Sequence, residues 1–271
     1  MPVNDELGKR MKEYYEGIPK TRLMRRCPVM LRLDGVAFHT FTRGLKRPFD
    51  DILRNSMNDT MLYLCSKIQG CVFGYTQSDE ISLLLIDYKN LDSSAWFDYE
   101  VEKICSVASG MATLAFNKAF EKHVEEYISR VKWPVDEETN TYIKTLRRKV
   151  RQGGFFDTRC FNIPKEEVCN MFYWRQLDAR RNSISMVAQS IFSSKELHKK
   201  TSSDKKEMLL EKGIDWDAYA PSYKWGTSCF KKCVENSNKT MWFLDTNMPL
   251  LKNTEDADYR FYVEKYVFVG E

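Results

Sequence analysis

The 271-residue sequence has few of the residues that build metal clusters or disulfide frameworks. It contains three histidines and eight cysteines, and the cysteines are scattered without any Cys-x-x-Cys pair. A structural zinc site needs closely spaced thiolate and imidazole ligands, and a disulfide scaffold needs a denser set of cysteines. The sequence therefore predicts reduced, mostly buried thiols and neither kind of site.

Long apolar runs and low-complexity segments are also missing. A helix that spans a bilayer needs about 20 consecutive apolar residues, and the sequence has no such run. The N-terminal segment is charged rather than apolar, so we expect a cytoplasmic protein without membrane contact. The net charge is only +4, and any basic surface must come from local clusters.

Hydrophobic periodicity predicts a mixed fold. Strand-like runs cover residues 29–33, 72–76, 81–86 and 158–163, and helical patterns lie between them, including one over about 96–130. The order strand, helix, strand, strand, helix, strand predicts an α+β fold. We expect the ferredoxin-like antiparallel sheet of polymerase palms, with helices on one face.

The chain is long enough for one large domain or two packed ones. We expect residues 1–150 to form the palm-like catalytic domain. Residues 151–271 would form a mostly helical region that completes the sheet and adds RNA-binding elements. Within it, helical patterns cover about 165–192 and 205–211, and residues 259–269 read as a terminal strand.

Three acidic residues lie at the ends of predicted strands. Asp34 follows the first strand, and Asp79 and Glu80 lie at the tip of the hairpin. The predicted order makes this strand and the hairpin neighbours, so the carboxylates should converge. Such oxygen ligands select Mg²⁺, and two ions can activate a hydroxyl and stabilise a leaving phosphate. The alternative is that Asp34-Gly35 and Ser78-Asp79 are ordinary turn dipeptides.

Candidate phosphate-binding residues occur in two places. Arg47 precedes a helix that starts after Asp50, and a helix N-terminus with adjacent cations attracts anions. Lys103 and Ser106 share one face of the long helix. We assign these four residues, together with Ser78, to nucleotide binding. The alternatives are a plain N-cap for Asp50, a solvated loop for Arg47 and a surface position for Lys103.

A dense run of basic residues covers 144–151, and further basic residues follow in the C-terminal half of the chain. Trp174 and Tyr223 lie among them, and aromatic rings interleaved with cations suit RNA ends, where bases stack. Trp174 is nevertheless expected in the core, because most tryptophans pack there, and His39 is expected to pack beside Phe38. The candidate RNA-binding residues are Lys144, Arg147, Arg148, Arg151, Arg175, Arg180, Arg181, Asn182 and Lys224.

Several motifs in this order resemble the tRNA-His guanylyltransferase family, whose members are reverse, 3′-to-5′ RNA polymerases. The resemblance covers about residues 6–230. It rests on Leu31-Arg32-Leu33-Asp34-Gly35, Phe38-His39, Arg47-Pro48-Phe49-Asp50, Gln77-Ser78-Asp79-Glu80, Lys103-Ile104 and Trp174-Arg175-Gln176.

The resemblance implies a polymerase-like palm with two Mg²⁺ ions, ATP and GTP as substrates, a tRNA partner and a homotetramer. It implies that the 5′ end of the tRNA is activated with ATP and then attacked by the 3′-hydroxyl of an incoming nucleotide. The residues that match the family's metal site are Asp34, Gly35 and Asp79, with Glu80 as the adjacent acid, Asp50 near the activating nucleotide and Lys103 on its triphosphate.

The sequence departs from the family pattern at several positions. Phe49 stands in a motif that often reads Lys-Pro-Asn-Asp, and Tyr99 and Glu100 stand where members carry arginine. Residues 180–186 read Arg-Arg-Asn-Ser-Ile-Ser-Met instead of His-Ile-Asn-Asn-Leu-Tyr-Asn. This resembles the branch that repairs 5′-truncated tRNAs, so template-dependent repair is our main expectation. The alternatives are addition of the extra 5′ G to tRNA-His, a nucleotidyl cyclase, or a non-catalytic tRNA-binding protein.

Overall fold

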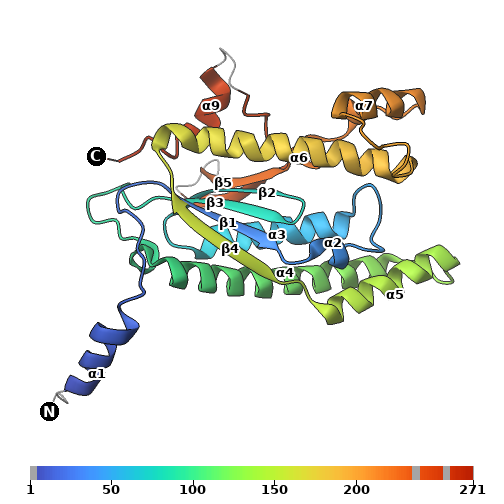
Figure 1. The fold of residues 1–271 in the computed structure, drawn as a ribbon. Helices are drawn as coiled ribbons and strands as arrows, with labels where there is room; N and C mark the ends of the chain where they lie inside the picture. The colour runs from blue at the N-terminus through green and yellow to red at the C-terminus, as the bar shows by residue number, and fades with distance from the viewer. Residues whose placement is uncertain (1–4, 234–238, 253–256, 271) are drawn as a thin grey trace.

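Within the described residues, the sheet at the centre of the molecule has six strands. The computed structural model describes residues 5–233, 239–252 and 257–270 (Figure 1). All strand pairs are antiparallel, in the order β4-β1-β3-β2-β5-β6. Their bounds are β1 Val29–Gly35, β2 Cys71–Gln77, β3 Glu80–Leu85, β4 Phe156–Asn162, β5 Thr227–Cys233 and β6 Thr240–Asp245. The first four strands have the order predicted for a ferredoxin-like palm.

Helices cover both faces of this sheet. The predicted helices α3 (Asp51–Lys67) and α4 (Val101–Arg130) lie on one face, and α6 (Val168–Ile191) lies across the other (Figure 1). The two faces of β1 show the same division. Leu31 packs in the cluster that includes α3 and α4, and Met30 packs in the cluster that includes α6. The C-terminal half therefore adds a second helical layer to the α+β fold.

The remaining elements are short or lie at the periphery. Further helices are α1 (Glu6–Met11), α2 (Phe38–Phe41), α5 (Glu137–Gln152), α7 (Ser202–Glu211) and α8 (Pro221–Lys224). A π-helical segment covers Lys12–Glu16, and 3-10 turns cover Trp96–Tyr99, Lys165–Glu167 and Trp216–Ala218. No helix in the described part of the chain is long and apolar enough to cross a membrane.

The predicted terminal strand at 259–269 is wrong, because the chain forms helix α9 (Ala257–Glu264) there. Val263 and Val267 lie four positions apart, and both are fully buried against the α6 face of the sheet. The ring of Tyr262 packs edge-on against Phe230. The apolar residues that were read as a strand therefore pack from helix α9 and from the turn that follows it.

The strands contributed by residues 151–271 lie in the same sheet as those contributed by residues 1–150. β4 pairs with β1, and β5 pairs with β2. The division into two domains at residue 150 stays a prediction, since both segments build one sheet.

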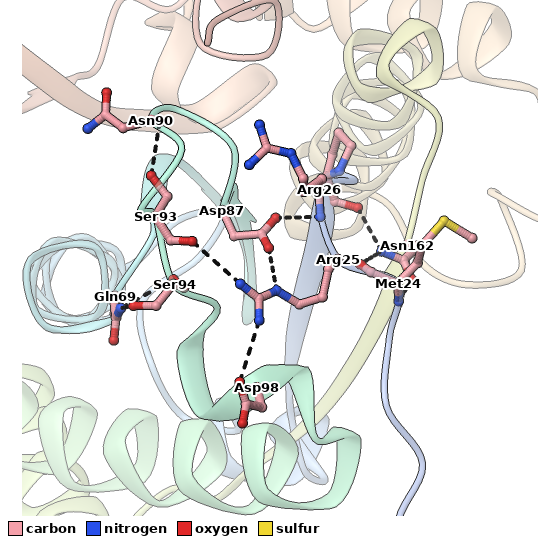
Figure 2. A network of polar contacts seen from close by, with 11 residues as sticks. Met24, Arg25, Arg26, Gln69, Asp87, Asn90, Ser93, Ser94, Asp98 and Asn162 are labelled. Atoms are coloured by element: carbon pink, nitrogen blue, oxygen red, sulfur yellow. Dashed lines mark hydrogen bonds and ion pairs between the residues drawn. The ribbon is translucent and has the colours of Figure 1, made fainter. Parts of the chain in front are cut away.

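The basic segment before β1 is held against the body of the protein by Asp87 (Figure 2). Asp87 is buried, and its carboxylate accepts from Arg25 Nε at 2.6 Å and from the backbone N–H of Arg26 at 2.8 Å. Asn162 at the end of β4 exchanges two hydrogen bonds with the backbone of Met24. Arg25 therefore neutralises a buried carboxylate and fixes the entry into β1.

Candidate active site between β1 and the β2–β3 hairpin

The acidic residues converge where β1 ends and the hairpin turns. Asp34 lies opposite Glu80 in the register of β1 and β3. The backbone N–H of Gly35 donates to the carbonyl of Asp79 at 3.1 Å. Asp34, Asp79 and Glu80 all line one cavity of about 450 Å³, under α6. The predicted convergence is therefore present in the structure.

The carboxylate of Asp79 is partly buried, and its surroundings disfavour the charged form. Burial raises the pKa of its carboxyl, and the charge of Asp34 adds to this. The Ser78 hydroxyl donates to Asp79 Oδ1 at 2.9 Å and offsets part of the rise. Ser78 has a φ of 51°, a left-handed conformation that is uncommon for serine and brings its hydroxyl to the carboxylate. A cation beside Asp34 and Asp79 would relieve their repulsion.

This donor set fits magnesium better than a metal that is held by protein ligands alone. Across the described residues, no group of three or more histidine, cysteine, aspartate or glutamate side chains is arranged to hold a metal ion. Mg²⁺ usually takes one or two carboxylates and completes its shell with water and substrate phosphates. Asp34 and Asp79 provide such a pair.

Glu80 forms a buried ion pair with Arg175 of α6. Its Oε1 accepts from Arg175 Nε at 2.8 Å, and both side chains are buried. Burial raises the pKa of Glu80, and Arg175 opposes that rise. Arg175 also donates to Asp178 at 2.8 Å, so its predicted role as an RNA contact is not supported by its position. We assign Arg175 to positioning Glu80.

A second cavity, of about 520 Å³, adjoins the acidic one and is lined with cations. His39, Arg43, Lys46 and Arg47 line it together with Asp79. His39 is exposed, so its predicted packing role is wrong. Arg43 was not identified from the sequence, although it lies four residues after His39 at the end of a helical turn. Cations beside a carboxylate pair suit the phosphates of a nucleotide.

Asp50 serves as the N-cap of α3. Its Oδ1 accepts from the backbone N–H groups of Ile52 and Leu53 at 3.0 and 3.1 Å. Its Oδ2 accepts from the backbone N–H of Lys46 and from the Tyr142 hydroxyl, at 2.9 and 2.7 Å. Burial and the hydrogen bond to Asp50 raise the pKa of Tyr142. The carboxylate of Asp50 is thus fully occupied, as the N-cap alternative predicted.

Lys103 and Ser106 lie apart from both cavities. They are exposed on α4, and Lys103 Nζ lies 5.0 Å from the centroid of the Phe97 ring. The part of α4 nearest the Asp34 end of the sheet is further along the helix, where Ser109 bonds Thr158 on β4. The assignment of Lys103 and Ser106 to nucleotide binding stays a prediction. The structure places neither residue beside the carboxylates of Asp34 and Asp79.

The remaining candidate RNA-binding residues lie in three places. Lys144, Arg147 and Arg151 line a groove of about 750 Å³ between α4 and α5, and Arg148 is exposed on the same helix. Arg180 and Arg181 line a cavity of about 510 Å³ that also includes Trp174. Asn182 is exposed and lines the acidic cavity.

Two residues depart from their predicted environments. Trp174 is 47% exposed, so its predicted place in the core is wrong, and the guanidinium carbon of Arg175 lies 4.4 Å from the centroid of its ring. Lys224 is buried, and its Nζ donates to the carbonyl of Asp217 at 2.7 Å. The ammonium group of Lys224 therefore does not face solvent, where a phosphate of RNA would contact it.

A palm-like antiparallel sheet with a carboxylate pair beside a cationic cavity is the architecture of a nucleotidyltransferase. The family model described as tRNAHis guanylyltransferase (Thg1) matches residues 8–164. The chain belongs to this family, as the sequence motifs indicated.

Solved structures and a curated relative extend this match to most of the chain. A bacterial tRNA(His) guanylyltransferase (Thg1)-like protein in complex with ATP is 34% identical, with a TM-score of 0.79 over 97% of this chain and 100% of that chain. A bacterial Thg1-like protein in complex with GTP is 32% identical, with a TM-score of 0.76 over 98% and 100%. The "Probable tRNA(His) guanylyltransferase" of Dictyostelium discoideum is 26% identical over 231 residues, which are 80% of each chain.

Proposed function

We propose that the protein adds a nucleotide to the 5′ end of a tRNA, with addition of guanosine to tRNA-His as the first candidate. The observation that carries this proposal is the carboxylate pair of Asp34 and Asp79 at the junction of an acidic and a cationic cavity. The names of the relatives support guanylyl addition better than they support our expectation of repair. The relatives bound to ATP and GTP support these nucleotides as substrates.

In the proposed reaction, the 5′-phosphate of the tRNA attacks ATP and displaces pyrophosphate, which gives an adenylylated 5′ end. The 3′-hydroxyl of an incoming nucleotide then attacks the 5′ phosphorus, loses its proton and displaces AMP. Two Mg²⁺ ions at Asp34 and Asp79 would lower the pKa of this hydroxyl and stabilise the leaving phosphate. The Ser78 hydroxyl orients Asp79, and Arg175 holds Glu80 beside the pair. Arg43, Lys46 and Arg47 would bind the phosphates in the adjoining cavity.

Template-directed repair of a 5′-truncated tRNA is the second candidate. It is favoured by Arg180 and Arg181, which replace the histidine and isoleucine of the family element, and by the higher identity to the Thg1-like protein than to the curated guanylyltransferase. The homotetramer and the cytoplasmic location remain predictions from the family resemblance.

One assay separates these functions. Incubate the protein with Mg²⁺, ATP and all four nucleoside triphosphates, and supply either tRNA-His without its extra 5′ G or a tRNA that lacks its first 5′ nucleotide. Extension of the first substrate by G alone supports guanylyl addition. Extension of the second by the nucleotide that complements the 3′ strand supports repair.

The Asp79→Ala variant is the matched control for this assay, and it should abolish extension of either substrate. Extension that persists in this variant would refute the metal assignment. Formation of a cyclic nucleotide without extension would instead indicate a cyclase. Binding of tRNA without consumption of nucleotide would indicate a non-catalytic tRNA-binding protein.

A further inference from the structure

A third cavity, of about 100 Å³, lies between α3, α6 and the start of β5. Ser78 lines this cavity as well as the acidic and cationic ones, and Asn182 lines both this cavity and the acidic one. A buried water needs about 10–15 Å³, so the space exceeds that of a single bridging water. The cavity is therefore a side chamber of the candidate active site.

One wall of the chamber is a stack of flat groups. The rings of Phe49 and Tyr223 stack with centroids 4.9 Å apart and planes inclined by 27°. The guanidinium carbon of Arg54 lies 4.2 Å from the centroid of Tyr223. Asp51 fixes the wall, because its Oδ1 accepts from the Tyr223 hydroxyl at 2.5 Å and pairs with Arg54 at 3.1 Å. Aromatic and guanidinium planes of this kind suit the faces of nucleobases.

Two buried polar atoms on α3 have no partner within the described part of the chain. They are Asn58 Oδ1 and Arg54 Nε, and both side chains line the chamber. The two residues lie four positions apart, on one face of the helix. A buried polar group without a hydrogen bond is costly, so at a cavity each of these atoms favours a water molecule or a ligand group that supplies the bond.

We propose that the chamber is a base-recognition pocket, an inference that rests on the proposed function. A nucleobase would enter it with an N–H group directed at Asn58 Oδ1 and a ring nitrogen or carbonyl directed at Arg54 Nε. Both kinds of group are present on base edges. The carboxylate of Asp50 already accepts hydrogen bonds from Lys46, Ile52, Leu53 and Tyr142, so it offers no free acceptor to a base in the chamber. The base belongs either to a free nucleoside triphosphate or to the end of the RNA.

The test compares Asn58→Leu with Asn55→Leu, a control on the same helix that does not line the chamber. Titration calorimetry in Mg²⁺ would measure the affinity for each nucleoside triphosphate and for ribose 5′-triphosphate, which has no base. Filter binding would measure the affinity for a 5′-truncated tRNA. We expect Asn58→Leu to weaken binding of one base-containing ligand about tenfold and to leave ribose 5′-triphosphate unchanged. Asn55→Leu should match the wild type.

The two sources of the base give different results. A loss confined to nucleoside triphosphates identifies the free nucleotide, and a loss confined to tRNA identifies the RNA end. The Arg54→Lys variant keeps the charge and removes the Nε donor, and it should reproduce the loss. Wild-type affinity of Asn58→Leu for every ligand would show that the chamber holds only water and would overturn the proposal.

Stability separates recognition from a structural role. Asn58→Leu removes an unsatisfied acceptor, so its Tm should equal or exceed that of the wild type. A lower Tm together with weaker binding of ribose 5′-triphosphate would overturn the proposal. The proposed function and the pocket are tested by different measurements. A wild-type protein that never extends tRNA refutes the function, whereas the dependence of binding on the base tests the pocket.

Discussion

Arg175 donates to Glu80 at 2.8 Å, and this buried ion pair joins the helix on one face of the sheet to the strand that carries the acidic residues. Arg175 belongs to α6 and Glu80 begins β3. The same guanidinium also pairs with Asp178. The relative position of α6 and the active site is therefore set by a charged contact as well as by apolar packing.

We predict that Arg175→Met lowers the free energy of unfolding by about 3–5 kcal/mol, because it leaves the buried Glu80 carboxylate without its partner. Urea denaturation measures this loss. The double variant Arg175→Met, Glu80→Gln should recover much of it, since the unpaired charge is gone. Arg181→Met, at an exposed position on the same helix, is the control. A loss in the double variant as large as in Arg175→Met would contradict the ion-pair explanation.

Asp79→Asn should stabilise the metal-free protein at neutral pH. The pKa of Asp79 is raised in the folded state, so the group's contribution to stability is fully present below its usual pKa of 3.8 and is lost as the pH rises through the folded pKa. The variant removes that cost, which is about 1.4 kcal/mol for each unit of pKa.

Thermal melts at pH 7 and at acid pH measure this effect. The gain in Tm should shrink as the pH falls toward 4, and millimolar Mg²⁺ should raise the Tm of the wild type more than that of Asp79→Asn. Asp92→Asn, on an exposed loop, is the control. A variant with a lower Tm than the wild type at pH 7 without Mg²⁺ would be inconsistent with this explanation.

Asp50→Ala should destabilise the protein by about 3 kcal/mol. The N-cap contributes about 1 kcal/mol, and the Tyr142 hydroxyl and the backbone N–H of Lys46 lose their acceptor. Tyr142→Phe removes one of these hydrogen bonds and should cost about 1 kcal/mol. Urea midpoints compare the two variants. Wild-type stability of Asp50→Ala combined with lost nucleotide binding would instead make Asp50 a ligand.

The basic face of α5 gives a prediction about RNA. If Arg147 contacts a phosphate, Arg147→Gln should weaken tRNA binding and reduce the slope of log affinity against log salt by about 0.9. Filter binding between low and moderate salt measures the slope. Lys67→Gln, at the end of α3, is the control for a lost charge elsewhere. An unchanged slope for Arg147→Gln would remove this groove from the RNA surface.

The parts of the fold with strong local signals were predictable from the sequence. The apolar run of β1 ends at Asp34-Gly35, and the hairpin of β2 and β3 turns at Ser78-Asp79, as the turn residues indicated. Helix α5, the strands β5 and β6 and the helix α9 were not identified. β6 alternates little between buried and exposed positions because it lies at an edge of the sheet, so its pattern is weak.

The candidate site was predictable only where chain order determined it. The convergence of Asp34 with Asp79 follows from the strand order. The partners of Arg175 and Lys224 could not be predicted from the strand order. A basic residue that pairs in the protein interior looks the same in the sequence as one that faces RNA. Asn58 and Arg54 gave no signal, since their lack of partners exists only in the folded protein.

The pairing of Asp34 with Glu80 makes the register of two central strands a condition for chemistry. Side chains alternate between the faces of a sheet, so a slip of β1 by one residue would turn Asp34 toward α4 and place Leu33 at the acidic cavity. A molecule with that slip would keep its composition and most of its secondary structure, yet it would have no carboxylate pair. Catalytic activity therefore requires the correct register of β1 against β3, and a loss of activity can report a shift in that register.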